Sequence, residues 1–199
     1  MIPKHIIQSA IAEYDTLTEF RDEGRMNIAT PSQEIINLFV PYIQKAYGKP
    51  IKHVGGNFYK HSFSYMPHTD YEKKVGSDIN AVLPLWIENN AHLVVFDQLY
   101  QGVHPVTWMM HHPHYVLTDS TALLGEMYKY NLKGLTTKPI DDELYEYIDM
   151  YPKEYLYGLS GKAYSFEPGN IIIFDNRQPH CTSKYEGTKL GLSLRFKEI

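Results

Sequence analysis

The sequence predicts an α+β fold that consists mainly of β-strands packed as an antiparallel sandwich or jelly roll. Three observations favour this class. Helical periodicity is confined to residues 1–50, short strand-like runs recur through residues 51–199, and 17 of the 199 residues are tyrosine. Tyrosine is enriched in strands and in aromatic pocket walls. Helices followed by many short strands are typical of a sandwich or jelly roll supported by helices.

Length and composition indicate one domain spanning residues 1–199, because a chain of this size is short for two cores. A net charge of −4 without a run of Lys or Arg argues against nucleic acid as a partner. The N-terminal residues lack the apolar core of a signal peptide, and no stretch approaches the roughly 20 apolar residues that span a bilayer. The single cysteine, Cys181, cannot form an internal disulfide. We therefore expect a cytoplasmic protein with no membrane contact.

Residues 1–50 are expected to form helical support. Ser32 is a suitable N-cap, Gly48 is a suitable C-terminal stop, and Pro41 is expected to break or kink the helix between them. Apolar residues between the two caps recur with helical spacing. This stripe comprises Ile35, Ile36, Phe39, Ile43 and Tyr47.

Residues 51–199 are expected to form the jelly-roll core. Strands are predicted at 52–64, 78–88, 91–98, 162–166, 170–175 and 188–196. The second and third of these are expected to pair through a turn at Asn89–Asn90. An insertion at about residues 100–161 contains a short helix capped by Asp141. It is longer than a sandwich connection requires, and we expect it to shape a substrate pocket.

The stretch SYMPHTDYEK places His68 and Asp70 two residues apart. On an extended chain, such residues project to the same side. A second signal is a buried strand at 171–174, which leads through the polar turn DNRQ to His180. Two imidazoles and one carboxylate would leave open positions on a metal, the arrangement that non-haem Fe(II) oxygenases use.

The last predicted strand alternates between apolar residues and a polar face that carries Lys189, Ser193 and Arg195. On an inner strand, two unpaired cations would be costly to bury, so this face predicts an anionic ligand such as a dicarboxylate. The alternative is an edge strand with Lys189 and Arg195 in solvent.

The order of these motifs resembles the Fe(II)/2-oxoglutarate-dependent oxygenases. Over about residues 55–196 it is most similar to their prolyl-4-hydroxylase-like branch, including relatives from bacteria and marine phages. The resemblance implies a double-stranded β-helix, that is, a distorted, cupin-like jelly roll, and it implies Fe(II), 2-oxoglutarate and O2 as cofactors and co-substrates. It further implies a dioxygenase, an oxidoreductase that hydroxylates a C–H bond of a small molecule or peptidyl residue and releases succinate and CO2.

The resemblance also implies roles for individual residues. His68, Asp70 and His180 would bind iron, and the iron centre would be the catalytic site. Lys189 would hold the remote carboxylate of 2-oxoglutarate. The same carboxylate would accept a hydrogen bond from Ser193, and a tyrosine, either Tyr59 or Tyr65, would complete the pocket. Arg195 is the competing candidate for the anchor.

Substrate contacts are predicted only for Arg177 and Trp108, and Arg177 could equally stabilise its turn. His111, His112 and His114 are expected at the lip of a substrate channel rather than as metal ligands. The substrate is a small molecule or a peptide. The sequence specifies neither its identity nor the oligomeric state.

Two other classes of function fit the same residues. A cupin-type metalloenzyme that does not use 2-oxoglutarate would recruit a further histidine ligand, such as His61 or His92. A non-catalytic jelly-roll module would bind a ligand in a tyrosine-lined groove, and neither metal nor chelators would change that binding.

Overall fold

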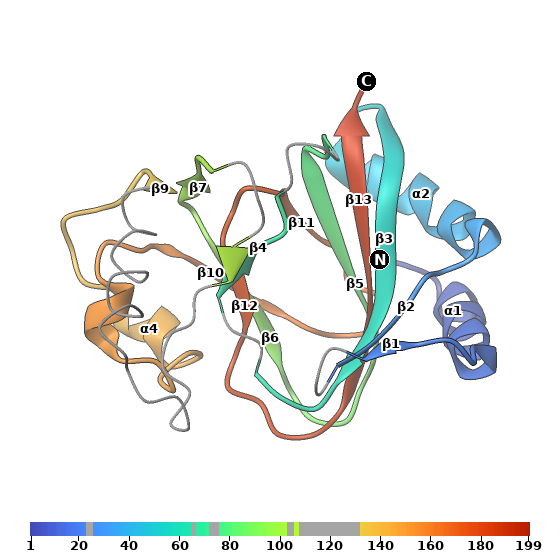
Figure 1. Ribbon diagram of the computed structural model, residues 1–199, viewed down its shortest axis with the longest axis horizontal. Helices are drawn as coiled ribbons and strands as arrows, with labels where there is room; N and C mark the ends of the chain where they lie inside the picture. The colour runs from blue at the N-terminus through green and yellow to red at the C-terminus, as the bar shows by residue number, and fades with distance from the viewer. Residues whose placement is uncertain (23–25, 65–66, 72–75, 103–105, 108–131) are drawn as a thin grey trace.

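The computed structural model describes residues 1–22, 26–64, 67–71, 76–102, 106–107 and 132–199. Two antiparallel sheets face each other at the centre of the molecule (Figure 1). The larger sheet has the strand order β1-β2-β3-β13-β5-β11, and the smaller sheet has the order β10-β6-β12-β4-β8. From β3 to β6, and again from β10 to β13, successive strands along the chain alternate between the two sheets. This topology confirms the predicted double-stranded β-helix.

The larger sheet consists of β1 (Arg21–Asp22), β2 (Met26–Ala29), β3 (Ile51–His61), β5 (Ile79–Ile87), β11 (Ile172–Asp175) and β13 (Lys189–Glu198). The smaller sheet consists of β4 (His68–Thr69), β6 (His92–Phe96), β8 (Val106–Thr107), β10 (Gly161–Ser165) and β12 (His180–Thr182). A separate pair joins β7 (Leu99–Tyr100) to β9 (Leu132–Lys133).

Two helices, α1 (Lys4–Thr16) and α2 (Gln33–Tyr47), lie beside the larger sheet on the side away from the smaller one (Figure 1). The Ser32 hydroxyl accepts a hydrogen bond from the Ile35 N–H, and Gly48 ends α2 in the left-handed conformation, as predicted. Of the two outcomes predicted at Pro41, a break does not occur, because the helix continues through this residue. The apolar face of α2 packs into the core between the helices and the sheet, and this burial offsets the hydrogen bond that Pro41 removes.

The prediction that residues 1–50 are wholly helical is incomplete, because β1 and β2 extend the larger sheet beyond β3. Ile28 and Ala29 are buried where β2 pairs with β3. A strand of four residues is too short for its alternation to be recognised in the sequence.

The predicted hairpin at Asn89–Asn90 is also wrong. The two strands form, but β5 belongs to the larger sheet and β6 to the smaller one, so the turn carries the chain from sheet to sheet. Both edges of β5 are already occupied, by β13 and β11, and both edges of β6 by β10 and β12. Neither strand therefore has an edge left for the other.

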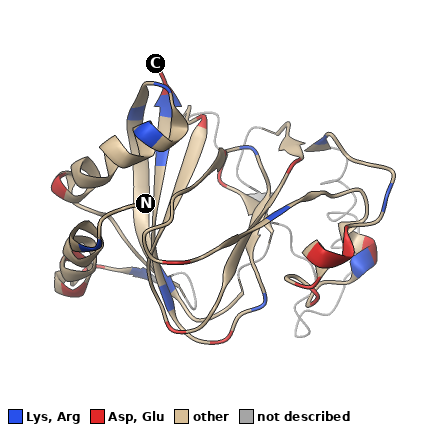
Figure 2. Ribbon diagram, turned by 180° about the vertical axis from the view of Figure 1, so that it is seen from behind, with Lys and Arg blue, Asp and Glu red and all other residues tan. Residues whose placement is uncertain are grey.

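The insertion contains α4 (Asp142–Tyr145), capped by the Asp141 carboxylate as predicted, and the 3-10 turn η1 (Lys153–Leu156). Acidic residues gather at the start of α4 (Figure 2). Apolar residues from 140–159 pack against Val94, Phe96 and Cys181 of the smaller sheet. The described part of the insertion therefore backs the smaller sheet, and residues 108–131 lie outside the described ranges.

A third apolar cluster joins the two sheets through Val82, Leu93, Val95 and Phe174, among others. This cluster holds the two sheets together beside the space that they enclose. Among the described residues, no helix is long and apolar enough to cross a bilayer.

Gly55 and Gly56 provide a matched test of how tightly β3 packs on β13. A Cβ added at Gly56 would lie 2.3 Å from the Ser193 carbonyl oxygen, whereas one at Gly55 would lie 3.6 Å from the nearest atom, in Arg195. We expect Gly56→Ala to lower the free energy of unfolding by about 1–3 kcal/mol, because the backbone of β13 cannot yield. Gly55→Ala should change it by less than about 1 kcal/mol, with stabilisation the expected sign. Urea unfolding of both variants measures the difference, and equal stabilities would contradict this packing.

Candidate metal centre and its cavity

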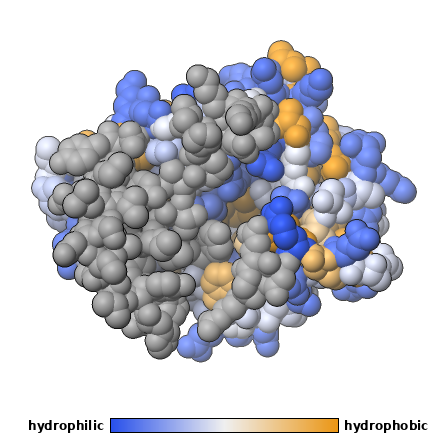
Figure 3. Space-filling model, in the orientation of Figure 1, coloured by the Kyte–Doolittle hydropathy of each residue, from blue (hydrophilic) through white to orange (hydrophobic). Residues whose placement is uncertain are grey.

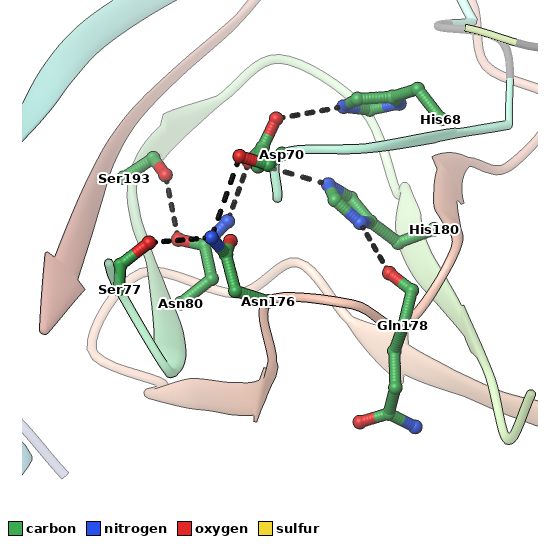
Figure 4. Close-up of polar contacts among 8 residues, drawn as sticks. All are labelled: His68, Asp70, Ser77, Asn80, Asn176, Gln178, His180 and Ser193. Carbon is green, nitrogen blue, oxygen red and sulfur yellow. Dashed lines mark hydrogen bonds and ion pairs between the residues drawn. The ribbon is translucent and has the colours of Figure 1, made fainter. Parts of the chain in front are cut away.

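The candidate metal centre lies where β4 and β12 are neighbours, with His68 directly opposite His180. Asp70 follows β4 and turns its two carboxylate oxygens toward the two imidazoles (Figure 4). The distance from His68 Nε2 to Asp70 Oδ1 is 3.6 Å, and that from His180 Nε2 to Asp70 Oδ2 is 3.7 Å. One ligand atom from each residue lies within 4.8 Å of the other two. The structure therefore brings together the three side chains that the sequence proposed as metal ligands.

His180 is held in the form that a metal requires. Its Nδ1 lies 3.1 Å from the Gln178 carbonyl oxygen, which can only accept, so Nδ1 donates and Nε2 keeps its lone pair. The side chain is only 4% exposed. Burial, together with the neighbouring His68, lowers the pKa of His180 to about 4 against the opposing effect of Asp70. The imidazole is therefore neutral near pH 7.

Asp70 is held by a chain of polar contacts that begins on β13. The Ser193 hydroxyl donates to Asn80 Oδ1 at 2.8 Å, and Asn80 Nδ2 donates to Asp70 Oδ2 at 2.6 Å (Figure 4). Asn176 Nδ2 donates to the Asp70 backbone oxygen at 3.4 Å and to Ser77 Oγ at 2.6 Å. Because Asn80 is fully buried on an inner strand, this series of hydrogen bonds restrains the Asp70 carboxylate.

The charged form of Asp70 is favoured by its surroundings. Burial alone would raise the pKa of this carboxyl group, but the two imidazoles, Arg195 and the Asn80 hydrogen bond outweigh burial and lower it below its usual value. A restrained carboxylate beside two imidazoles is a donor set that suits a divalent transition metal with open coordination positions.

A cavity of ≈270 Å³ opens between the two sheets beside these residues. Hydrophilic side chains are visible in the recess between the sheets (Figure 3). The described lining comprises Arg21, Met26, Ile28, Gly56, Asn57, Tyr59, His61, His68, Asp70, Val82, Leu93, His180, Thr182, Lys189, Ser193 and Arg195. The volume lies near the lower end of the range for small-molecule sites.

Lys189 lines this cavity as a buried cation, and the residue is only 1% exposed. Its Nζ donates to Thr182 Oγ1 at 3.1 Å and lies 4.4 Å from the centroid of the Phe166 ring. No carboxylate of the described chain forms an ion pair with it. Burial lowers the pKa of Lys189 to about 7. Because β13 lies between β3 and β5, the edge-strand alternative is wrong.

The other proposed co-substrate residues on β13 and β3 also line the cavity. Ser193 reaches it while donating to Asn80. The Arg195 guanidinium lies over Gly55, and the Tyr59 ring lies over Gly191, where a Cβ would come within 2.4 Å of it. Tyr65 lies outside the described residues.

The residues predicted to contact substrate are not part of this lining. Arg177 Nη2 donates to the Tyr71 hydroxyl at 3.5 Å, and the guanidinium stacks 4.8 Å from the centroid of that ring. Its backbone N–H donates to Asp175 Oδ1 within the turn. Trp108 lies outside the described residues, as do His111, His112 and His114.

The further histidines of the cupin alternative do not join the metal-compatible cluster in the described chain, which consists of His68, Asp70 and His180. His61 lines the cavity, and its Nδ1 lies 2.8 Å from the Phe63 carbonyl oxygen. His92 packs against Tyr147, with ring centroids 4.5 Å apart.

Two supporting residues, Asn80 and Thr182, were not predicted from the sequence. Asn80 is a lone polar residue in the apolar run INAVLPLW, and an unexplained amide on a buried strand is a signal for a partner. Thr182 follows His180 by two residues, so it projects to the same side of β12.

No protein-family model matches the sequence, and no curated protein matches it. Solved structures do match the fold. HygX from Streptomyces hygroscopicus, with nickel and 2-oxoglutarate bound, has a TM-score of 0.52 at 12% identity over 98% of this chain and 79% of that one.

Two further structures match comparably. The α-ketoglutarate-dependent carbocyclase SnoK from nogalamycin biosynthesis has a TM-score of 0.51 at 10% identity, over 98% of this chain and 75% of that one. An oxidoreductase of the 2OG-Fe(II) oxygenase family from Burkholderia pseudomallei has a TM-score of 0.50 at 10% identity, over 97% and 78%. The chain therefore shares the fold of the 2-oxoglutarate oxygenases.

Asn80→Ala tests whether the contact with Asp70 supports metal binding. Outer-shell partners of metal ligands contribute about 10–100-fold to affinity, and we expect a loss of that size for Ni(II). Ser193→Ala should cause a smaller loss, because Asn80 keeps its bond to Asp70. Isothermal titration of the folded variants measures both. The control is Asn89→Ala, which removes an exposed amide bound to the Glu186 carbonyl. If Asn80→Ala bound Ni(II) with an affinity within twofold of that of the unmodified protein, the assignment of Asn80 as a support for Asp70 would be contradicted.

Proposed function

We propose that the protein is an Fe(II)- and 2-oxoglutarate-dependent dioxygenase that hydroxylates a C–H bond of a small molecule or peptidyl residue. The observation that carries this proposal is the placement of His68, Asp70 and His180 in the same cavity as the buried, anion-free Lys189. A metal site alone would fit many enzymes. A metal site and a buried cation in one cavity match a dicarboxylate that is bound at both ends.

His68, Asp70 and His180 fit Fe(II) as its ligands, since their donor set is two imidazoles and one carboxylate. When bound, iron and 2-oxoglutarate would supply the oxidation of a C–H bond by O2, with release of succinate and CO2. The chain itself would orient both. Gln178 holds the His180 ring, and Asn80 holds Asp70.

Lys189 is the better of the two candidate anchors for the remote carboxylate of 2-oxoglutarate. It is almost completely buried, and burial lowers its pKa because the charged form loses its hydration. A bound carboxylate would restore that charge. Thr182 lies beside Lys189 Nζ and can donate its own hydroxyl proton to the same carboxylate. We assign Tyr59 to the wall of this subsite because its ring lies over Gly191, two residues after Lys189 on β13.

HygX, which shares the fold, was crystallised with nickel and 2-oxoglutarate, and this is consistent with the proposal. Membership of the prolyl-4-hydroxylase-like branch remains part of the proposal and rests on the motif order from His68 to Lys189. Cys181 is a free, buried thiol, in keeping with the proposed cytoplasmic location.

The proposed function is tested by adding Fe(II) and 2-oxoglutarate to the protein without oxygen. We expect a weak visible charge-transfer band, which His68→Ala should abolish. Under oxygen, succinate release should rise with the correct substrate in a panel that begins with prolyl peptides and free amino acids. A folded, metal-loaded protein that shows no band and consumes no 2-oxoglutarate would contradict the proposal and favour the cupin-type alternative. Ligand binding that neither metal nor chelators change would favour the non-catalytic module.

The lowered pKa of Lys189 predicts how 2-oxoglutarate affinity depends on pH. The pKa of Lys189 is about 7, so above pH 7 an increasing fraction of the free protein carries a neutral Lys189. Binding the dianion 2-oxoglutarate to that form requires uptake of a proton. Affinity should therefore fall above pH 7, by up to tenfold per pH unit. In Lys189→Arg the pH dependence should disappear, because arginine stays charged. Titration of the anaerobic band across pH 7–9 measures this, and equal slopes in the two proteins would contradict the anchor assignment.

A further inference from the structure

We propose that Arg195 binds a carboxylate of the substrate, at the end of the cavity away from Lys189. This inference rests on the proposed function, because it assumes that Lys189 holds the co-substrate. It names a substrate class, a small molecule or peptide that carries one carboxylate, and a residue that selects it.

The register of the larger sheet places Arg195 beside the metal centre. Arg195 lies directly opposite Asn80 on β5, and opposite residues in neighbouring strands project to the same face. The Asn80 amide contacts the Asp70 carboxylate, so this face is the one that looks onto the metal centre. Arg195 also acts on Asp70 electrostatically, and it contributes to the lowered pKa of that carboxyl group.

Lys189 and Arg195 lie at opposite ends of the cavity. They are six residues apart on one strand, a span of about 20 Å. Lys189 is opposite His61 on β3, whereas Arg195 is opposite Gly55. One small dicarboxylate bound to the metal cannot engage both cations. If Lys189 holds the co-substrate, Arg195 remains available to a second ligand.

No described residue pairs with the Arg195 guanidinium. It lines the cavity, and it forms neither a hydrogen bond nor an ion pair with any described residue. The guanidinium lies beside Gly55, where an added Cβ would make an ordinary contact of 3.6 Å with Arg195 Nη2. A guanidinium presents its donors in a planar fork that matches a carboxylate, and nothing in the described chain uses that fork.

Charge in the loaded cavity favours one further anion. Lys189 and Arg195 face a single lining carboxylate, Asp70. Fe(II) would add two positive charges and 2-oxoglutarate would remove two, so one positive charge would remain. Arg21 also lines the cavity and makes a contact of its own, whereas Arg195 has no hydrogen-bond or ion-pair partner among the described residues.

The test is an NMR titration of the Arg195 Nε–H resonance, assigned by its loss in Arg195→Lys, with acetate as the probe. The protein is loaded with Zn(II), which is diamagnetic, and with saturating 2-oxoglutarate. We expect a saturable shift with a Kd of about 1–10 mM, and no shift with the neutral isostere acetamide. Arg177, which is stacked on Tyr71 outside the cavity lining, is the internal control and should drift only with ionic strength.

Three outcomes would overturn the inference. The first is an Arg195 resonance that shows no saturation up to about 100 mM acetate. The second is an equal response to acetamide. The third is a resonance that 2-oxoglutarate itself saturates, which would make Arg195 the co-substrate anchor. Repeating the titration without Zn(II) or 2-oxoglutarate tests anion binding at Arg195 independently of the proposed function. A saturable shift there, in a protein that binds no 2-oxoglutarate, would support an anion site while the proposed function fails.

Arg195→Gln separates the substrate role from two structural ones. We expect the 2-oxoglutarate Kd and the Ni(II) Kd of this variant to stay within about twofold of the unmodified protein, while the acetate response of the cavity is lost. A tenfold loss of 2-oxoglutarate affinity would assign Arg195 to the co-substrate. A tenfold loss of Ni(II) affinity, with the acetate response retained, would reduce its role to holding the charge of Asp70.

Discussion

The pairing of β12 with β4 is the constraint on which the rest of the site depends. It sets His180 directly opposite His68, although the two residues are far apart in the sequence. The hydrogen bond from His180 Nδ1 to the Gln178 carbonyl then fixes which ring nitrogen faces Asp70. Without this register the three side chains would not share a point in space, and the buried Lys189 of β13 would have no metal-bound ligand to face.

The strand β13 connects the metal centre to the rest of the cavity. Its apolar face packs against the helices through Leu190, Leu192 and Leu194, which are buried in the cluster that includes α1 and α2. Its polar face carries Lys189, Ser193 and Arg195 along one wall of the cavity. The helices therefore contribute to function by holding a strand whose charged face would otherwise be unstable in the interior. Fold stability and ligand binding are linked through this one element.

Local signals in the sequence predicted much of the site. His68 and Asp70 are two residues apart, His180 ends a short turn, and the polar face of β13 follows from alternation, so each was recognisable within a few residues. Asn80 was missed because its partner, Asp70, becomes its neighbour only through sheet register. The hairpin at Asn89–Asn90 was predicted wrongly for the same reason, since local sequence does not show which sheet a strand joins. Strand existence is a local property, whereas pairing is set by the whole fold.

The most direct measurement is a crystal structure of the protein grown without oxygen in the presence of Fe(II) and 2-oxoglutarate. We predict one iron bound by His68, Asp70 and His180, with the remote carboxylate of 2-oxoglutarate paired to Lys189 and the Arg195 guanidinium still open to a second anion. Iron bound elsewhere, or the remote carboxylate paired to Arg195, would contradict this prediction.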